Sequence, residues 1–151
     1  GWDTHVSQGQ LYGKHRQLLG NVANAFQAFH RDMQEQWEDV LIVTMTEFGR
    51  TSKENGSRGT DHAESTAMFV AGGGVKGGVY NCDRSNWKNG DMFSTKNGRY
   101  LARKTDFRSV FGEIFSDHFG NTPKQLDDVI PTYAQAKKEN PSDFKKLGFI
   151  S

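Results

Sequence analysis

The sequence predicts an α/β fold in which a mostly parallel sheet is covered by helices in three layers. Two observations carry this prediction. Residues 40–46 and 66–71 are apolar, β-branched runs, and an amphipathic helix is expected at 10–36, before the first of them. Unbroken apolar runs are typical of strands buried on both faces. A helix followed by such a strand is the order of βαβ units, so we expect the two strands to be adjacent and parallel.

The helix expected at 10–36 carries one apolar stripe along its length. The apolar residues recur at steps of three or four, which places them on one face of an α-helix, and the opposite face is polar. We therefore predict that the stripe packs as part of the core. Its members are Leu11, His15, Leu18, Val22, Phe26, Phe29, Met33 and Trp37.

The composition indicates one domain with a modest core. The chain has 151 residues, 34% of them hydrophobic, and its net charge of +1 argues against a nucleic-acid surface or a polybasic membrane surface. No run approaches the ~18 apolar residues that a membrane span needs. We expect residues 1–151 to be a single domain that forms the C-terminal part of a larger one, because reactive side chains seldom stand in the first few residues of a domain.

Turn and cap signals punctuate the second half of the chain. Asn-Gly dipeptides at 89–90 and 97–98 suit short hairpins. Thr105 or Asp106 is expected to cap a helix that runs to about Phe119.

Asp3 and His5 form the first candidate metal pair. Residues 2–6 are expected to be the end of a strand, and an extended backbone points side chains two positions apart to one face. A carboxylate oxygen and an imidazole nitrogen are both accepted by divalent transition metals. The alternative is an aspartate that caps the following helix beside a surface histidine.

Glu47 and Arg50 follow the predicted strand 40–46. Ligands in open α/β sheets bind outside the carboxyl ends of the strands, so Glu47 is a candidate metal ligand. The guanidinium of Arg50 could donate two hydrogen bonds to an anionic substrate.

Asp61 and His62 close the loop 47–65. A long structureless loop in a compact domain usually binds something. Adjacent residues in a turn can serve a metal as ligand and as hydrogen-bonded partner, although a simple turn with a solvated histidine is the alternative. The predicted metal-binding residues are Asp3, His5, Glu47, Asp61 and His62.

Four short motifs, in this order along the chain, resemble a known family. They are Gly1-Trp2-Asp3-Thr4-His5, Thr46-Glu47-Phe48-Gly49-Arg50-Thr51, Gly59-Thr60-Asp61-His62 and Thr105-Asp106-Phe107-Arg108. Together they resemble the C-terminal portion of the proteins called domain of unknown function 1501, from Gly1 to about Asp128. These proteins group with the alkaline phosphatase and sulfatase superfamily.

The resemblance implies a partial alkaline-phosphatase-like fold and a metal-dependent hydrolase of phosphate or sulfate esters. It makes Asp3 and His5 similar to the first metal pair of the superfamily and His62 similar to a later metal histidine, whereas Phe48 stands where the phosphatases carry a histidine. Zinc is the expected metal, with manganese or calcium as alternatives. The implied substrate is an anionic small-molecule or polysaccharide ester, and the nucleophile is expected upstream of Gly1.

The rival hypothesis is a non-catalytic binding or scaffold protein of the same fold with at most a structural metal. A Ser, Thr, Cys or Asp on the upstream strand would favour catalysis. No activity is expected of residues 1–151 alone. Members of the family usually carry a twin-arginine export signal, so the resemblance implies a periplasmic or secreted protein. No nucleic-acid partner is expected.

Overall fold

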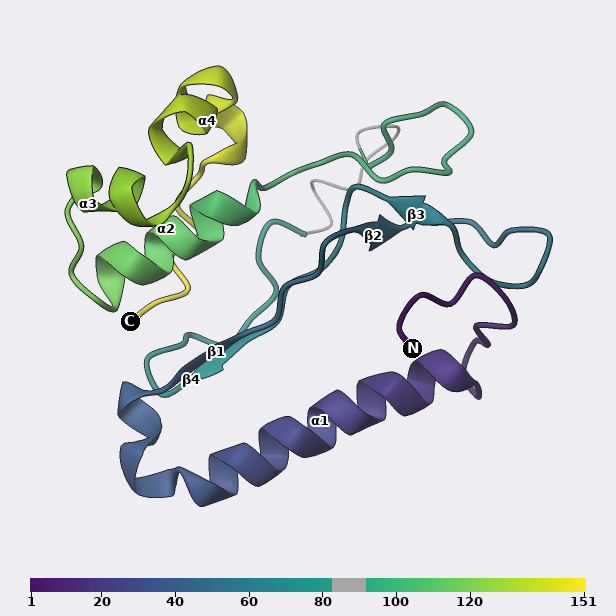
Figure 1. Ribbon diagram of the computed structural model, residues 1–151, viewed down its shortest axis with the longest axis horizontal. Helices are drawn as coiled ribbons and strands as arrows, with labels where there is room; N and C mark the ends of the chain where they lie inside the picture. The colour runs from purple at the N-terminus through teal and green to yellow at the C-terminus, as the bar shows by residue number, and fades with distance from the viewer. Residues whose placement is uncertain (83–91) are drawn as a thin grey trace.

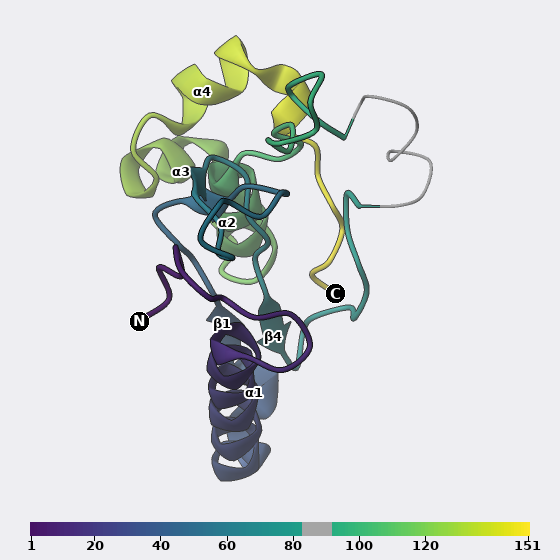
Figure 2. The same ribbon diagram turned by 90° about the vertical axis from the view of Figure 1, so that its right-hand side faces the viewer.

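A computed structural model describes residues 1–82 and 92–151 of the chain. Figures 1 and 2 show three tiers: the long helix α1, then a narrow arm of strands, then the C-terminal helices. The helical elements are α1 (Lys14–Asp32), η1 (Gln34–Asp39), α2 (Phe107–Asp117), α3 (Pro123–Val129), α4 (Tyr133–Glu139) and η2 (Pro141–Asp143). The strands are β1 (Leu41–Val43), β2 (Gly49–Arg50), β3 (His62–Ala63) and β4 (Val70–Gly72).

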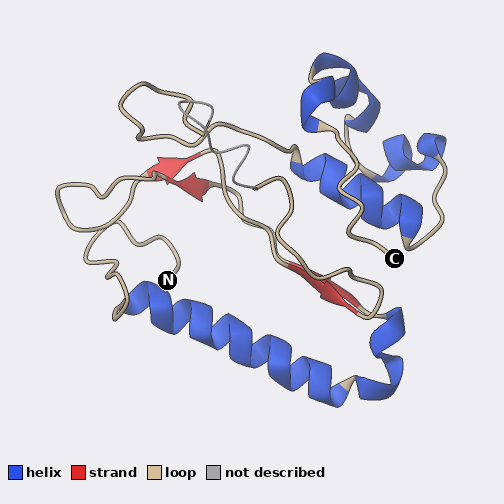
Figure 3. Cartoon of the chain, turned by 180° about the vertical axis from the view of Figure 1, so that it is seen from behind, coloured by secondary structure: helices blue, strands red, loops and turns tan. Residues whose placement is uncertain are grey.

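The four described strands lie in one stretch of chain, which forms an extended arm and then doubles back along itself. β1 pairs antiparallel with β4, with Ile42 opposite Ala71, and β2 pairs antiparallel with β3, with Arg50 opposite His62. Figure 3 shows the two short ladders along the same extended arm. Residues 51–61 form the loop that joins the two halves of the arm.

The prediction of adjacent strands is confirmed, but the prediction that they run parallel is wrong. Parallel neighbours need a crossover of a dozen or more residues, usually a helix, to return the chain to the starting end of the sheet. The described segment 44–69 contains no helix and turns back directly, so the strands oppose each other. The described residues therefore show helices with small antiparallel sheets in place of a three-layer parallel sheet.

Helix α1 is shorter than the predicted 10–36, and its apolar stripe is not a core. None of its side chains, all of which are described, is buried. Phe26 is half-buried, Leu11, just before the helix, is 77% exposed, and Phe29 is 43% exposed. Val22, Met33 and Trp37 are also half-buried, so the stripe is covered only in part. Within the described residues, no helix combines the length and apolar character that crossing a membrane requires.

The buried core lies between α2 and the C-terminal segment. Its central cluster is formed by Val110, Ile114, Phe149 and Ile150. The strands β1 and β4 contribute Leu41, Val43 and Val70 to its edge. The core is thus built on the opposite side of the strands from α1, as Figure 2 shows for α2.

Glu113 fixes the C-terminal segment in this core. Glu113 is only 6% exposed. Its carboxylate accepts hydrogen bonds from the backbone N–H groups of Leu147 (2.6 Å) and Phe149 (2.8 Å). These bonds satisfy a charge that would otherwise be costly to bury. They also position Ile150 for its antiparallel bridge with Val75.

Local signals in the second half of the chain agree with the structure. α2 begins after the predicted cap Asp106, and Gly120, at φ +70°, follows its end. The predicted hairpin turn at 97–98 is present, because Phe93 and Leu101 form an antiparallel bridge around it. The hairpin predicted at 89–90 lies outside the described residues.

Truncation of the core should cost far more than truncation of the stripe. Ile114 is 3% exposed, so Ile114→Ala should lower the free energy of unfolding by about 2–5 kcal/mol. Phe29→Ala should cost less than about 1 kcal/mol, because Phe29 is already partly solvated. Urea denaturation of the two variants measures both values, and equal losses would contradict this assignment of the core.

Asp106 should make stability depend on acid pH. Three hydrogen bonds from Arg108 hold the pKa of this carboxyl, 5% exposed, below its ordinary range, although burial acts in the opposite direction. The stabilisation is therefore fully present above the unfolded-state pKa of about 3.9 and is lost as the pH falls through the lower folded-state pKa.

The matched variant for this effect is Asp106→Asn, which keeps a capping oxygen but removes the charge. We expect it to cost about 1–3 kcal/mol at neutral pH, and the difference from wild type should shrink below about pH 4. Asp128→Asn, at an exposed position, should change stability by less than about 0.5 kcal/mol. A difference that stays constant from pH 7 to pH 2 would contradict the role of the ion pair.

Candidate metal centre

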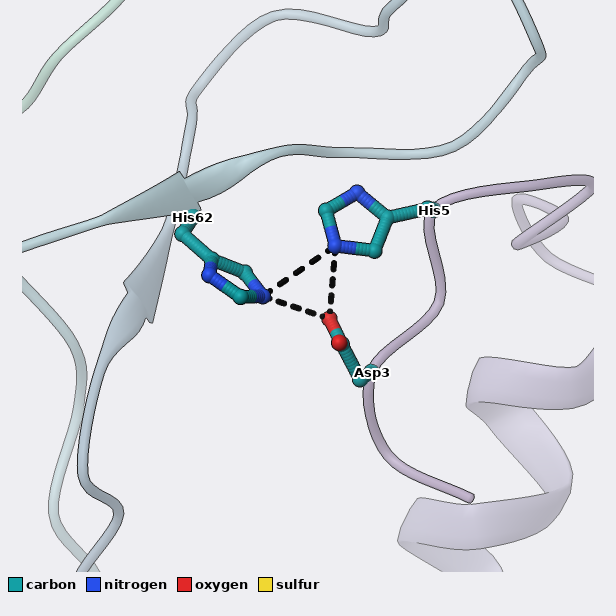
Figure 4. Close-up of side chains that lie close together, drawn as sticks. All are labelled: Asp3, His5 and His62. Atoms are coloured by element: carbon teal, nitrogen blue, oxygen red, sulfur yellow. Dashed lines mark hydrogen bonds and ion pairs between the residues drawn. The ribbon is translucent and has the colours of Figure 1, made fainter.

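Three of the predicted ligands converge beside β3. As Figure 4 shows, the rings of His5 and His62 and the carboxylate of Asp3 point toward one another. The Oδ1 atom of Asp3 lies 3.0 Å from Nε2 of His5 and 2.9 Å from Nε2 of His62. The two Nε2 atoms are 3.1 Å apart. The three donor atoms therefore form a nearly equilateral triangle.

The triangle fits a shared metal ion. Donors bound at about 2.1 Å from one ion, at angles between a right angle and the tetrahedral angle, lie about 3.0–3.4 Å from each other. Hydrogen bonds alone satisfy at most two of the three contacts, since each ring N–H points at one acceptor. A cation held by all three atoms would satisfy every contact. The described residues thus contain a group that could hold a metal.

Backbone hydrogen bonds carry the N-terminal segment to this position. Residues 2–6 do not form the predicted strand, yet the amide N–H of Ser7 bonds the carbonyl of Ser57 (3.0 Å), and that of Thr60 bonds the carbonyl of Thr4 (3.2 Å). These bonds lay the segment against the end of the loop 51–61. The N–H of His5 bonds the carbonyl of Asp3 (3.2 Å), and Asp3 and His5 point to one side, as Figure 4 shows.

Gly59 permits this close approach. A Cβ atom at this position would lie 2.2 Å from the carbonyl carbon and oxygen of His5, so no larger residue fits without moving the backbone. Beside it, the hydroxyls of Thr4 and Thr60 both donate to Oε1 of Gln8, at 2.8 and 2.6 Å. The glycine and the shared acceptor together hold the two segments at the separation that the triangle needs.

His62 is oriented by β2 and β3. It pairs with Arg50 across the ladder, and its ring stacks on Phe48 with the ring centres 3.9 Å apart. Arg50 donates to Oδ1 of Asp3 and to the carbonyl of Thr60, the latter at 2.8 Å. The Arg50 guanidinium therefore holds the carboxylate side of the triangle while Phe48 holds the ring of His62.

Asp61 lies behind His5 and outside the triangle. Its Oδ1 atom is 3.4 Å from Nδ1 of His5 and accepts from the side-chain amide of Asn55 at 2.8 Å, while Oδ2 accepts from Arg99. The hydrogen bond from Asn55, followed by the contacts with His5 and Arg99, lowers the pKa of Asp61 against the effect of desolvation. The structure thus places Asp61 as a hydrogen-bonded partner of His5.

Glu47 does not join the group. Its side chain is exposed and forms no hydrogen bond or ion pair with any other residue that the structure describes. His62 stands opposite Arg50 in the ladder, whereas Glu47 lies before the paired residues and is not part of the donor group. The antiparallel return of the chain, rather than parallel strand ends, decides which residues meet.

The site holds an ionised carboxylate and is open to solvent. Desolvation raises the pKa of Asp3, but hydrogen bonds from His62 and Arg50 and nearby positive charge outweigh it, and the net pKa is lower than usual. The side chains of Asp3, His5 and His62 are 48%, 42% and 50% exposed. An ionised carboxylate at an accessible position is suited to a cation that also binds ligands from solvent.

The contributors that were not predicted as site residues include Phe48, Asn55 and Arg99. The Asn55-Gly56 dipeptide indicates only a turn. Arg99 comes from a separate hairpin, and no sequence spacing links it to Asp61. Phe48 was compared with a metal ligand, whereas its ring serves as a stacking surface.

The fold and site define a mixed helix and strand protein with a candidate metal centre on its surface. A family model described as "Protein of unknown function (DUF1501)" matches residues 1–97, and the chain belongs to this family. The match contains Asp3, His5 and His62, and it ends before Arg99 and the motif at 105–108. A search of curated proteins and a search of solved structures each found no match.

Loss of one triangle residue should abolish tight metal binding. Losing an outer hydrogen-bond partner typically weakens metal binding about 10–100-fold. In the natural full-length protein, His62→Ala should weaken zinc binding by more than this, because it removes a direct donor. His30→Ala is the matched control, since His30 lies on α1 against Trp37. Titration calorimetry measures both, and equal affinities for the two variants would rule out the triangle as the binding site.

Proposed function

We propose that this protein is a metal-dependent hydrolase of phosphate or sulfate esters in which Asp3, His5 and His62 hold the metal. The observation that carries the proposal is the triangle of donor atoms, 2.9, 3.0 and 3.1 Å apart, on an open surface. The ester class is supported by the resemblance of the four motifs to the alkaline phosphatase and sulfatase superfamily.

Zinc is the metal that the donor set favours. Two imidazole nitrogens and one carboxylate oxygen are common zinc donors. Calcium prefers a shell made entirely of oxygen atoms, so the two histidines argue against it. Manganese remains the second choice, because it accepts mixed nitrogen and oxygen ligands.

The openness of the site favours catalysis over a structural role. Structural zinc sites are closed by four protein ligands, whereas catalytic ones keep a position for water or substrate. The described residues bring three donors together, and each side chain is at least 42% exposed. When bound, a divalent metal supplies Lewis acidity that polarises an ester oxygen and lowers the pKa of a water molecule.

The residues around the triangle would prepare it for an anionic ester. Asp3 supplies the negative charge that retains the cation, and Arg50 fixes the orientation of that carboxylate. A guanidinium carries five N–H donors, more than the protein contacts of Arg50 use, so it can also contact an oxygen of the substrate. The resemblance places the nucleophile upstream of Gly1 and the protein in the periplasm or outside the cell, and both stay predictions.

Hydrolysis of an aryl phosphate and an aryl sulfate by the natural full-length protein tests the proposal. Zinc-loaded protein should hydrolyse at least one of them, a chelator should stop the reaction, and His62→Ala should lose zinc and hydrolysis together. His30→Ala should retain both.

Two outcomes would contradict this assignment. Zinc-loaded protein that hydrolyses neither ester would overturn the hydrolase proposal and favour the scaffold alternative. Loss of zinc from His62→Ala with hydrolysis unchanged would show that the metal is structural and that the chemistry takes place elsewhere.

A further inference from the structure

Asn55 uses every polar atom of its side chain to join the two segments that form the centre. Its Nδ2 donates to the carbonyl of His5 (3.0 Å) and to Oδ1 of Asp61 (2.8 Å). Its Oδ1 accepts from the backbone N–H groups of Ser57 (2.9 Å) and Gly59 (3.1 Å). The partners fix which atom is which, because the reverse orientation would aim an amide N–H₂ at two donors and an oxygen at two acceptors.

The bond from Asn55 to Asp61 determines how His5 is presented. An ionised carboxylate only accepts hydrogen bonds. Oδ1 of Asp61 lies 3.4 Å from Nδ1 of His5 and Oδ1 of Asp3 lies 3.0 Å from Nε2, so a metal that takes the lone pair of Nε2 leaves the proton on Nδ1, facing Asp61. A neutral ring with its proton on Nδ1 has its lone pair on Nε2. Nε2 is the atom that lies in the triangle with Asp3 and His62.

We propose that Asn55 is a positioning residue of the metal centre, which holds Asp61 and the His5 backbone so that the His5 ring presents Nε2 to the metal. The inference rests on the metal centre proposed above. Asn55 itself contacts none of the three triangle donor atoms, and its influence passes through Asp61 and through the His5 carbonyl. Partners of this kind orient metal-binding histidines and select their tautomer.

Asn55→Asp separates positioning from the folding of the loop. It keeps an acceptor for the N–H groups of Ser57 and Gly59 but replaces the donor that faces Asp61 and the His5 carbonyl with a second carboxylate oxygen. The added negative charge would by itself strengthen cation binding. Weaker binding would therefore report the loss of positioning.

The test is carried out on the natural full-length protein with zinc alone as the probe. Asn55→Asp should bind zinc about 10–100-fold more weakly than wild type, the usual cost of losing an outer hydrogen-bond partner. Asn24→Asp, at an exposed position on α1, is the control with the same chemical change and should bind as wild type does. Proton NMR of the zinc-loaded protein should show the Nδ1 proton of His5 downfield in wild type, where it donates to Asp61, and shifted upfield in Asn55→Asp.

Asp61→Asn acts on the same link from its other side and provides a second variant. It should weaken zinc binding to a similar degree, and the double variant should be little worse than either single one, because both changes break one connection. Circular dichroism checks that each variant keeps its fold.

Each other outcome overturns a distinct claim. Wild type that binds zinc, with Asn55→Asp unchanged in affinity and in the resonance of the His5 Nδ1 proton, would overturn the role of Asn55 alone. Additive losses in the double variant would show that Asn55 acts without Asp61. Wild type that binds no zinc would remove the metal centre itself, and this inference with it.

Discussion

The close packing of the N-terminal segment against the loop 51–61 is the contact on which the candidate centre depends. Asp3 and His5 lie on the N-terminal segment, and His62 directly follows the loop at the start of β3. Backbone hydrogen bonds at Thr4 and Ser7 and the absence of a side chain at Gly59 set their separation. Every later feature of the site, including the triangle of donors and the partners behind it, presupposes this contact.

Local features were predictable because they depend on neighbouring residues only. The cap at Asp106, the helix α2 and the turn at 97–98 follow from side chains within a few positions of each other. The direction of strand pairing was not predictable from apolar runs, because the connection between strands decides it. The stripe of α1 shows a second limit of prediction from sequence. Periodicity reveals an apolar face, but tertiary structure decides whether other residues cover that face.

The residues of the candidate site likewise fall into those that the sequence indicated and those that it did not. Asp3, His5 and His62 were indicated by residue type and by the resemblance of their motifs, and the structure brings them together. Glu47 was selected by an argument about parallel strand ends, and it stays apart. Asn55 and Arg99 gave no signal, since their contribution is a hydrogen bond to Asp61 that exists only after the loop and the hairpin have folded.

The distance along the chain between His5 and His62 has a consequence for folding energetics. An ion bound by both would cross-link two segments that are separated along the chain by α1, η1, β1 and β2, and only the folded state would bind it. By mass action, a ligand at about 100 times its dissociation constant adds about 2.7 kcal/mol to the free energy of unfolding. For a chain whose longest helix buries none of its side chains, the availability of metal would then govern how much of the protein is folded.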